Sequence, residues 1–110
     1  MCEFLGINHN IKWLSDLDIV FKEIQKPDDW GLQLSEFYGA HTYINAPGGQ
    51  EIYCKEKYSR HGIELVFYAP KFLHYDQKQE SFHKGLSIID VLMFNSKEEV
   101  NKMIDAFEVL

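Results

Sequence analysis

The polar residues between positions 70 and 85 are the first candidates for chemistry in this sequence. The segment PKFLHYDQKQESFHKG contains His74, Asp76 and His83, whose nitrogen and oxygen atoms are of the kinds that bind zinc. One residue separates His74 from Asp76 and six separate Asp76 from His83, and neither spacing belongs to the compact patterns in which a helix or a turn presets the ligand geometry. Assembling a site from a loop would also cost conformational entropy. The spacing therefore predicts no metal site and no cofactor.

Nucleophilic catalysis has equally weak support. Cys54 could meet His41 or His61 across neighbouring strands, but the sequence shows no helix N-terminus beside the thiol that would favour a reactive thiolate. Gly48-Gly49 is not followed by the Lys and Ser or Thr of a phosphate-binding loop, so the pair is interpreted as a hairpin turn. No spacing pairs the histidines as acid and base. The sequence therefore predicts a protein that is not an enzyme.

Acidic residues next to aromatic residues give a clearer signal. Asp28-Asp29-Trp30 is one such group, and Tyr75-Asp76 is another within the polar segment. At protein interfaces an aromatic side chain supplies buried contact area, and neighbouring charges set selectivity and association rate. We therefore expect a partner-binding surface formed by Asp28, Asp29, Trp30, Tyr75, Asp76 and Glu80.

The length of the 70–85 segment is informative in itself. It separates two apolar runs, HGIELVFYA and GLSIIDVLMF, by far more residues than a hairpin needs. Connections longer than about 12 residues without regular structure are uncommon in small domains and tend to be functional. We expect the segment to be a protruding interaction element.

The composition is that of one globular domain over residues 1–110. Hydrophobic residues make up 45% of the chain and aromatic residues 15%, which is enough for an aromatic-rich core. Seventeen acidic against eleven basic residues give a formal charge of −6, which disfavours direct nucleic acid binding and favours a basic protein partner. The N-terminus lacks the features of a secretory signal, and no apolar run approaches the roughly 20 residues of a spanning helix. We therefore expect a cytoplasmic protein that binds no membrane, with Cys2 and Cys54 reduced.

Two segments have the apolar periodicity of helices that dock on a core. LSDLDIVFKEIQ at 14–25 repeats its apolar residues at spacings of three and four, which predicts an N-terminal helix. Near the other end, Ser96 and Glu99 have the spacing of a capping box. Apolar residues at helical spacing follow them, namely Val100, Met103, Ile104 and Phe107. We predict a C-terminal helix over about 97–109.

The region between these segments has the pattern of strands. HTYINA, EIYCKEKYS, GIELVFYA and LSIIDVLMF are rich in β-branched and aromatic residues, and turn residues interrupt the series. GIELVFYA alternates as a strand covered on one side does, whereas LSIIDVLMF is apolar on both faces and is predicted to be a central strand. WGLQLSEFYG at 30–39 is ambiguous and could add an edge strand. These elements predict an α+β fold, with a mainly antiparallel sheet of about four to five strands and an N-terminal and a C-terminal helix.

The order of HGIELVF, a polar excursion and LSIIDVLMF, preceded by a helix and a polar strand, resembles the middle of a known protein class. This class comprises the small immunity proteins that accompany bacterial toxins of contact-dependent growth inhibition and bacteriocin systems. The resemblance covers residues 51–94 and lies in the pattern of strands. It implies a cytoplasmic protein that binds a cognate toxin, often a basic nuclease, and covers its active site or substrate groove. It transfers no functional residue to this chain.

Three functions are compatible with these features. The first is an immunity protein that neutralises a cognate toxin through its acidic and aromatic residues, and the sequence favours this interpretation. The second is a phage-type inhibitor of a host defence nuclease, which would use the same physics on a different partner. The third is a small-ligand-binding or enzymatic α+β domain with its pocket beneath the 70–85 segment.

Overall fold

The computed structural model describes all residues from 1 to 110, and the chain divides into two compact units. The first unit consists of Met1–Ile11 and Pro70–Glu108, and the second consists of Lys12–Ala69 and Val109–Leu110. Each unit is described by itself, and the prediction of a single domain over 1–110 stays a prediction. No helix is both long and apolar enough to cross a membrane.

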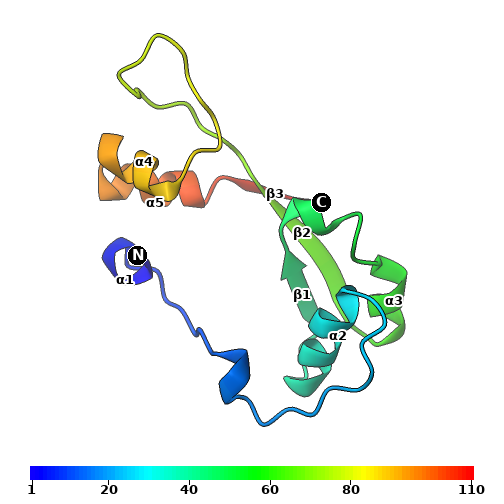
Figure 1. Cartoon of the computed structure of the whole chain (residues 1–110). Helices are drawn as coiled ribbons and strands as arrows, with labels where there is room; N and C mark the ends of the chain where they lie inside the picture. The colour runs from blue at the N-terminus through cyan, green and yellow to red at the C-terminus, as the bar shows by residue number, and fades with distance from the viewer. The chain divides into compact units, whose positions relative to one another are not determined.

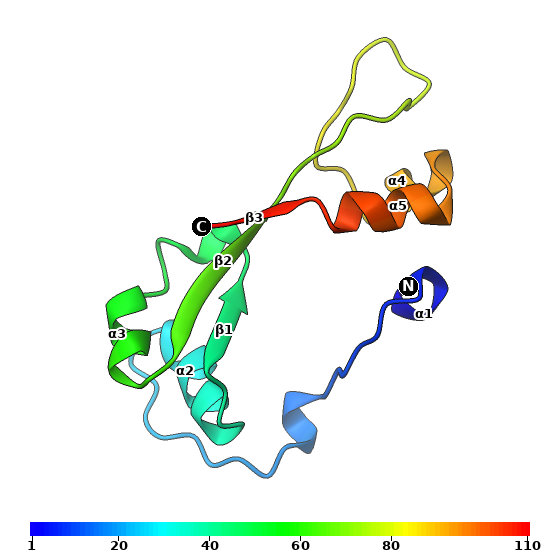
Figure 2. The same ribbon diagram turned by 180° about the vertical axis from the view of Figure 1, so that it is seen from behind.

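The second unit is built around two parallel strands, β1 (Thr42–Asn45) and β2 (Glu64–Pro70). Their register pairs Thr42 with Glu64 and Asn45 with Phe67. The connection between them contains a 3-10 turn, η2 (Pro47–Gly49), and the helix α3 (Lys55–Arg60), as Figures 1 and 2 show from opposite sides. Parallel neighbours need such a crossover because the chain must return to the starting end of the sheet.

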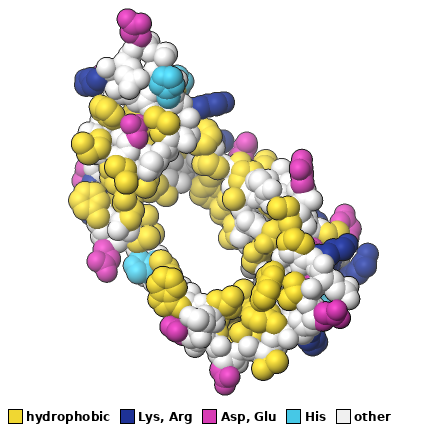
Figure 3. Space-filling model, in the orientation of Figure 1, with side chains coloured by type: hydrophobic (Ala, Val, Ile, Leu, Met, Phe, Trp, Pro, Cys, Tyr) yellow, Lys and Arg dark blue, Asp and Glu magenta, His cyan; other side chains and the backbone are white.

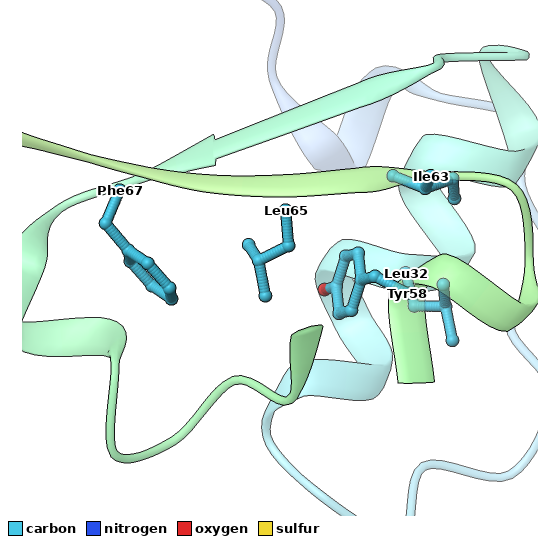
Figure 4. Packing of buried hydrophobic residues seen from close by; sticks show 5 residues of the cluster. All are labelled: Leu32, Tyr58, Ile63, Leu65 and Phe67. Carbon is cyan, nitrogen blue, oxygen red and sulfur yellow. The ribbon is translucent and has the colours of Figure 1, made fainter. Parts of the chain in front are cut away.

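The core of this unit forms where β2 meets two helices. Ile63, Leu65 and Phe67 are buried on one face, as the alternation in GIELVFYA predicted. Leu32 of α2 (Asp28–Phe37) and Tyr58 of α3 complete the cluster, and Figure 4 shows their side chains converging. This cluster fastens both helices to the strand through the burial of apolar surface.

The first unit is mainly helical. It contains α1 (Cys2–Leu5), α4 (Ile88–Phe94) and α5 (Lys97–Ile104), with α1 and α4 both packed against α5. Leu5 and Val100 are buried, and Asn101 Nδ2 donates to the Leu5 carbonyl oxygen over 3.1 Å. The burial of these apolar side chains and the hydrogen bond together hold the N-terminal helix on α5.

The predicted C-terminal helix is confirmed in its start but is shorter than expected. The hydroxyl of Ser96 accepts from the Glu99 N–H, and the Glu99 carboxylate accepts from the Ser96 N–H over 2.8 Å, which is a complete capping box. The helix ends at Ile104, and Phe107–Val109 form the strand β3. The sheet order is β1-β2-β3, and Leu110 donates its N–H to the Phe67 carbonyl oxygen over 2.8 Å. Phe107 therefore belongs to a strand and not to the helical stripe.

The predicted helix over 14–25 is wrong. Only the 3-10 turn η1 (Leu14–Asp16) forms there, and its N-cap makes no side-chain hydrogen bond. Side chains of α2 accept hydrogen bonds from backbone N–H groups of the preceding segment. In a helix such N–H groups would bond to backbone carbonyl oxygens four residues earlier. Lys22 donates to Gln33 Oε1 over 2.7 Å, and Gln25 and Lys26 each donate to Asp29 Oδ2 over 2.8 Å. Hydrogen bonds to side chains of α2 thus replace backbone hydrogen bonds within a helix.

The prediction of a central strand for LSIIDVLMF is also wrong, because this run forms α4. The Ser87 hydroxyl accepts from the Ile89 N–H over 3.2 Å and so caps the helix start, and Asn95 Nδ2 donates to the Val91 carbonyl oxygen over 2.8 Å near its end. A short continuous apolar run does not distinguish a strand from a helix by periodicity.

Two further segments are helical. EIYCKEKYS, which was expected to be a strand, ends in α3, and WGLQLSEFYG, which was ambiguous, lies within and just after α2. Gly48-Gly49 is a 3-10 turn and not a hairpin turn. Pro27 directly precedes α2, where a missing N–H costs nothing. The α+β class is therefore confirmed, but the sheet has three strands, not four to five, and its β1–β2 pair is parallel.

Gly31 offers a test of the packing of α2. A Cβ added there would lie 2.7 Å from both the Tyr58 hydroxyl oxygen and Tyr43 Cζ. Overpacking costs about 1–3 kcal/mol, and exchanging Gly for Ala in a helix returns up to about 1 kcal/mol. We expect Gly31→Ala to lower the free energy of unfolding by about 1–2 kcal/mol in urea titrations.

The matched control is Gly48→Ala, since nothing lies within 4 Å of a Cβ at that position. We expect this variant to stay within about 0.5 kcal/mol of the wild type. Equal stability of the two variants would contradict the close approach of α2 to the tyrosines.

Candidate functional site

A pocket of about 340 Å³ lies in the first unit, against α4 and α5 and beneath the segment that follows β2. The segment contributes Pro70, Lys71, Phe72, Leu73, Tyr75, Phe82, Gly85 and Leu86 to the lining. The helices contribute Ile88, Val91, Val100, Met103 and Ile104. The lining is therefore predominantly apolar, with a few polar groups.

The helical wall of the pocket follows from sequence spacing. Val100, Met103 and Ile104 belong to the apolar stripe that predicted α5, and the structure places all three in the lining. Val91 lies one turn after Ile88 on α4, so both reach the pocket from the same side of that helix. Each helix thus presents one apolar face to the pocket.

The other wall is held in shape by one buried amide. Gln77 is only 5% exposed, and its Oε1 accepts from the His83 N–H over 2.8 Å while its Nε2 donates to the His83 carbonyl oxygen over 2.9 Å. The side chain therefore bonds to the backbone of His83 as a neighbouring strand residue would. We call this paired contact the Gln77 clamp.

The Gln77 clamp is joined to α4 through a carboxylate. The Tyr75 hydroxyl donates to Asp90 Oδ2 over 2.5 Å, and Gln77 Nε2 lies 3.2 Å from the same oxygen. The hydrogen bond to the Asp90 carboxylate raises the pKa of Tyr75, because losing the phenolic proton would leave two negative charges together. Tyr75 therefore keeps its proton and ties the segment to the helix.

Aromatic contacts complete this wall. The Phe82 ring lies 4.1 Å from the His74 ring and 5.3 Å from the Tyr75 ring between centroids, the latter edge to face. His74 thus contacts an aromatic ring, and Ser81 Oγ lies 3.5 Å from His83 Nε2. In Figure 1 the segment still extends as a long loop away from α4 and α5, as expected of a protruding element, while its role in interactions stays a prediction.

Two of the predicted partner-binding residues serve the second unit's own structure. Asp28 is 1% exposed, and its Oδ1 lies 2.6 Å from Lys57 Nζ, so its carboxylate is engaged within the fold, and its role as a partner contact stays a prediction. Asp29 pairs with the same ammonium and caps the backbone of Gln25 and Lys26. The ring of Trp30 is partly exposed and lies edge-on to Phe21, with 4.7 Å between centroids.

The pairing of Asp29 favours its charged form. The hydrogen bond from Lys57, followed by those from the backbone of Lys26 and Gln25, lowers the pKa of Asp29 from 3.8 to about 2. All of these donors favour the charged carboxylate, so Asp29 joins the start of α2 to α3 and to the preceding segment.

The remaining predicted residues lie in the first unit and have separate surroundings. Tyr75 lines the pocket, while Asp76 is exposed and accepts from its own neighbour Lys78, with 2.7 Å to Nζ. Glu80 is exposed. Neither unit contains all six predicted residues, so no single unit forms the surface that was expected from them.

Sequence reasoning missed Lys71, Gln77, Asp90 and Val91 as site residues. A signal existed for Asp90, because a carboxylate inside an apolar run must either reach the surface or find a partner. For Gln77 there was none, since a glutamine in a polar segment is normally solvated.

The sequence model of the WbqC-like protein family matches residues 1–102. No curated protein and no solved structure matches the chain. The family match overturns the resemblance to toxin immunity proteins over 51–94. That resemblance depended on two successive strands, and the second of them, LSIIDVLMF, is the helix α4.

The Gln77 clamp can be tested by hydrogen exchange. Gln77→Ala removes the acceptor of the His83 N–H, and such a hydrogen bond contributes about 0.5–1.5 kcal/mol. We expect faster exchange of the His83 amide proton, measured by NMR. Gln79→Ala is the control, because Gln79 is an exposed residue of the same type two positions later. Unchanged protection in Gln77→Ala would disprove the clamp.

The role of Asp29 predicts a specific pH dependence. Because its pKa is lower in the folded chain than the usual 3.8, its charge stabilises the fold above about pH 4, and this contribution is lost as the pH falls through about 2. Asp29→Asn keeps an acceptor oxygen but removes the charge. We expect the stability difference between wild type and variant, from urea titrations, to shrink between pH 4 and pH 2. A difference that stays constant over this interval would contradict the role of the charge.

Proposed function

The chain belongs to the WbqC-like protein family, and from the geometry of its first unit we propose that it binds a small, largely apolar molecule in the pocket against α4 and α5. One observation carries this proposal, namely an apolar pocket whose loop wall is held by the Gln77 clamp. Ligand sites in proteins are typically clefts of about 300–1,000 Å³ with apolar walls and few polar groups. The pocket of about 340 Å³ falls within this range.

Exposed apolar surface in the lining supports the proposal. Phe72 is 53% exposed, Leu86 50% and Leu73 44%, and Figure 3 shows hydrophobic side chains gathered at the surface around α4 and α5. Covering such side chains with an apolar molecule removes this area from water, at a gain of roughly 25 cal/mol per Å². Binding therefore has a driving force in the hydrophobic effect.

A pocket wall that is already ordered lowers the entropic cost of binding. A segment of this length would lose much conformational entropy if it were ordered only when the ligand arrived. The Gln77 clamp and the Tyr75–Asp90 hydrogen bond hold it in place beforehand. The third of the functions considered from the sequence is thus the one that this geometry supports.

We propose binding and not catalysis for this pocket. Tyr75 is the lining residue with a hydroxyl group, and its proton is directed to Asp90. A toxin partner was expected on the basis of the immunity resemblance and the acidic residues, and it is not proposed here. A phage-type inhibitor is not proposed either, because that interpretation also depended on the acidic residues.

Methionine methyl NMR provides the test, because the three methionines have different surroundings. Met103 lines the pocket, whereas Met93 and Met1 do not and are 75% and 57% exposed. With methyl-labelled methionine and octanamide as a neutral apolar probe, we expect a saturable shift of the Met103 signal while the other two stay unchanged. Equal shifts of Met93 and Met103 would indicate adsorption to the surface and would contradict the proposal.

A pair of α4 variants sharpens the experiment. Val91→Trp places a large side chain in the pocket and should reduce the affinity for octanamide at least ten-fold. Ile89→Trp makes the same kind of change at an exposed position of the same helix outside the lining, and it should leave the affinity unchanged. The far-ultraviolet circular dichroism of both variants should match the wild type.

A further inference from the structure

We infer that the molecule bound in this pocket is an amphipathic organic anion, with its apolar body against α4 and α5 and its negative group at Lys71. This inference deepens the proposed function and rests on it. The observation behind it is the distribution of charge, since Lys71 is the only charged residue that lines the pocket.

The ammonium of Lys71 is available to a ligand. No ion pair involves this residue, although the chain has seventeen acidic residues against eleven basic ones. Lys57 and Lys78, in contrast, each pair with a nearby carboxylate. An unpaired cation beside an apolar pocket in an acidic protein favours an anion as the complementary group.

A backbone hydrogen bond fixes the position from which the Lys71 side chain extends. Its N–H donates to the Ala106 carbonyl oxygen over 2.8 Å, directly after the end of β2. The aliphatic stem of a lysine packs readily along apolar surface while its ammonium stays in water. Lys71 can therefore contribute to the apolar wall and still place its charge at the rim.

The size of the pocket limits the apolar body. A cavity of roughly 150 Å³ holds benzene, so a pocket of about 340 Å³ accommodates about 13 non-hydrogen atoms by proportion. A medium-chain fatty acid or an aryl-alkanoic acid has this size together with one negative charge. We therefore assign a monocarboxylate of this class.

Asp90 is the nearby group that would oppose an anion. Its carboxylate does not line the pocket, and it is engaged by the Tyr75 hydroxyl and Gln77 Nε2. These two donors direct the negative charge of Asp90 toward the clamp. A cationic ligand attracted by Asp90 would be the competing occupant, and the cationic probe octylammonium tests for it.

The experiment compares three probes that share one chain, namely octanoate, octanamide and octylammonium. The full chain is titrated with each probe at pH 7 and low salt while the Met103 methyl signal is followed. An exposed ion pair contributes about 0.2–1 kcal/mol, so we expect octanoate to bind about two- to five-fold more tightly than octanamide, and octylammonium to bind most weakly. Salt at about 1 M should remove the preference by screening.

Two variants identify the cation. Lys71→Gln should abolish the preference for octanoate over octanamide, and a saturable Met103 shift with octanamide would show that the pocket is still formed. Lys102→Gln makes the same change of net charge at an exposed α5 position outside the lining, and it should keep the preference.

The outcomes separate the two proposals. Equal affinities for octanoate and octanamide, or tighter binding of octylammonium, would overturn the anion assignment while the pocket stands. If none of the three probes shifts Met103, the proposed function itself is wrong. An octanoate preference that survives in Lys71→Gln would also overturn the role given to Lys71.

Discussion

The candidate site depends on one buried side-chain amide. Gln77 bonds to both backbone polar groups of His83 and reaches the Asp90 carboxylate, to which Tyr75 also donates. A buried amide without partners would be costly, so the conformation that satisfies it is strongly preferred. Because Asp90 belongs to α4, the same network ties the segment to the helix that forms the opposite wall of the pocket.

In the second unit, charged side chains hold two helices together. Lys57 of α3 meets the carboxylates of Asp28 and Asp29 at the start of α2, and the buried Tyr58 donates its hydroxyl to the Asp28 carbonyl oxygen over 2.8 Å. The negative charges also lie at the positive end of the α2 dipole. Residues with the composition of an interface thus hold two helices together, because a buried charge must be paired within the fold.

Apolar lining and unpaired charge together define the chemistry that the first unit supports. A wall of aliphatic and aromatic side chains selects an apolar body, and Lys71 at its rim selects the sign of the polar group. The family match covers almost the whole chain and is to the WbqC-like proteins, not to an immunity protein family.

Local signals in the sequence determined the start of α5, the strand β2 with its buried face, and the mixed α+β class. Each of these depends on residues within a few positions of one another, such as Ser96 with Glu99, or on a clear alternation. The tertiary structure decided the conformation of the segments that lack such a signal. LSIIDVLMF is apolar throughout, so only its caps and its packing on α5 make it a helix, and Asp29 satisfies the backbone that a helix over 14–25 would otherwise have used. The pocket joins residues from Pro70 to Ile104, and the Asp90 carboxylate accepts from Tyr75 and Gln77, which lie 15 and 13 positions earlier. No local pattern records that proximity, since these hydrogen-bond partners are chosen only when the chain is folded.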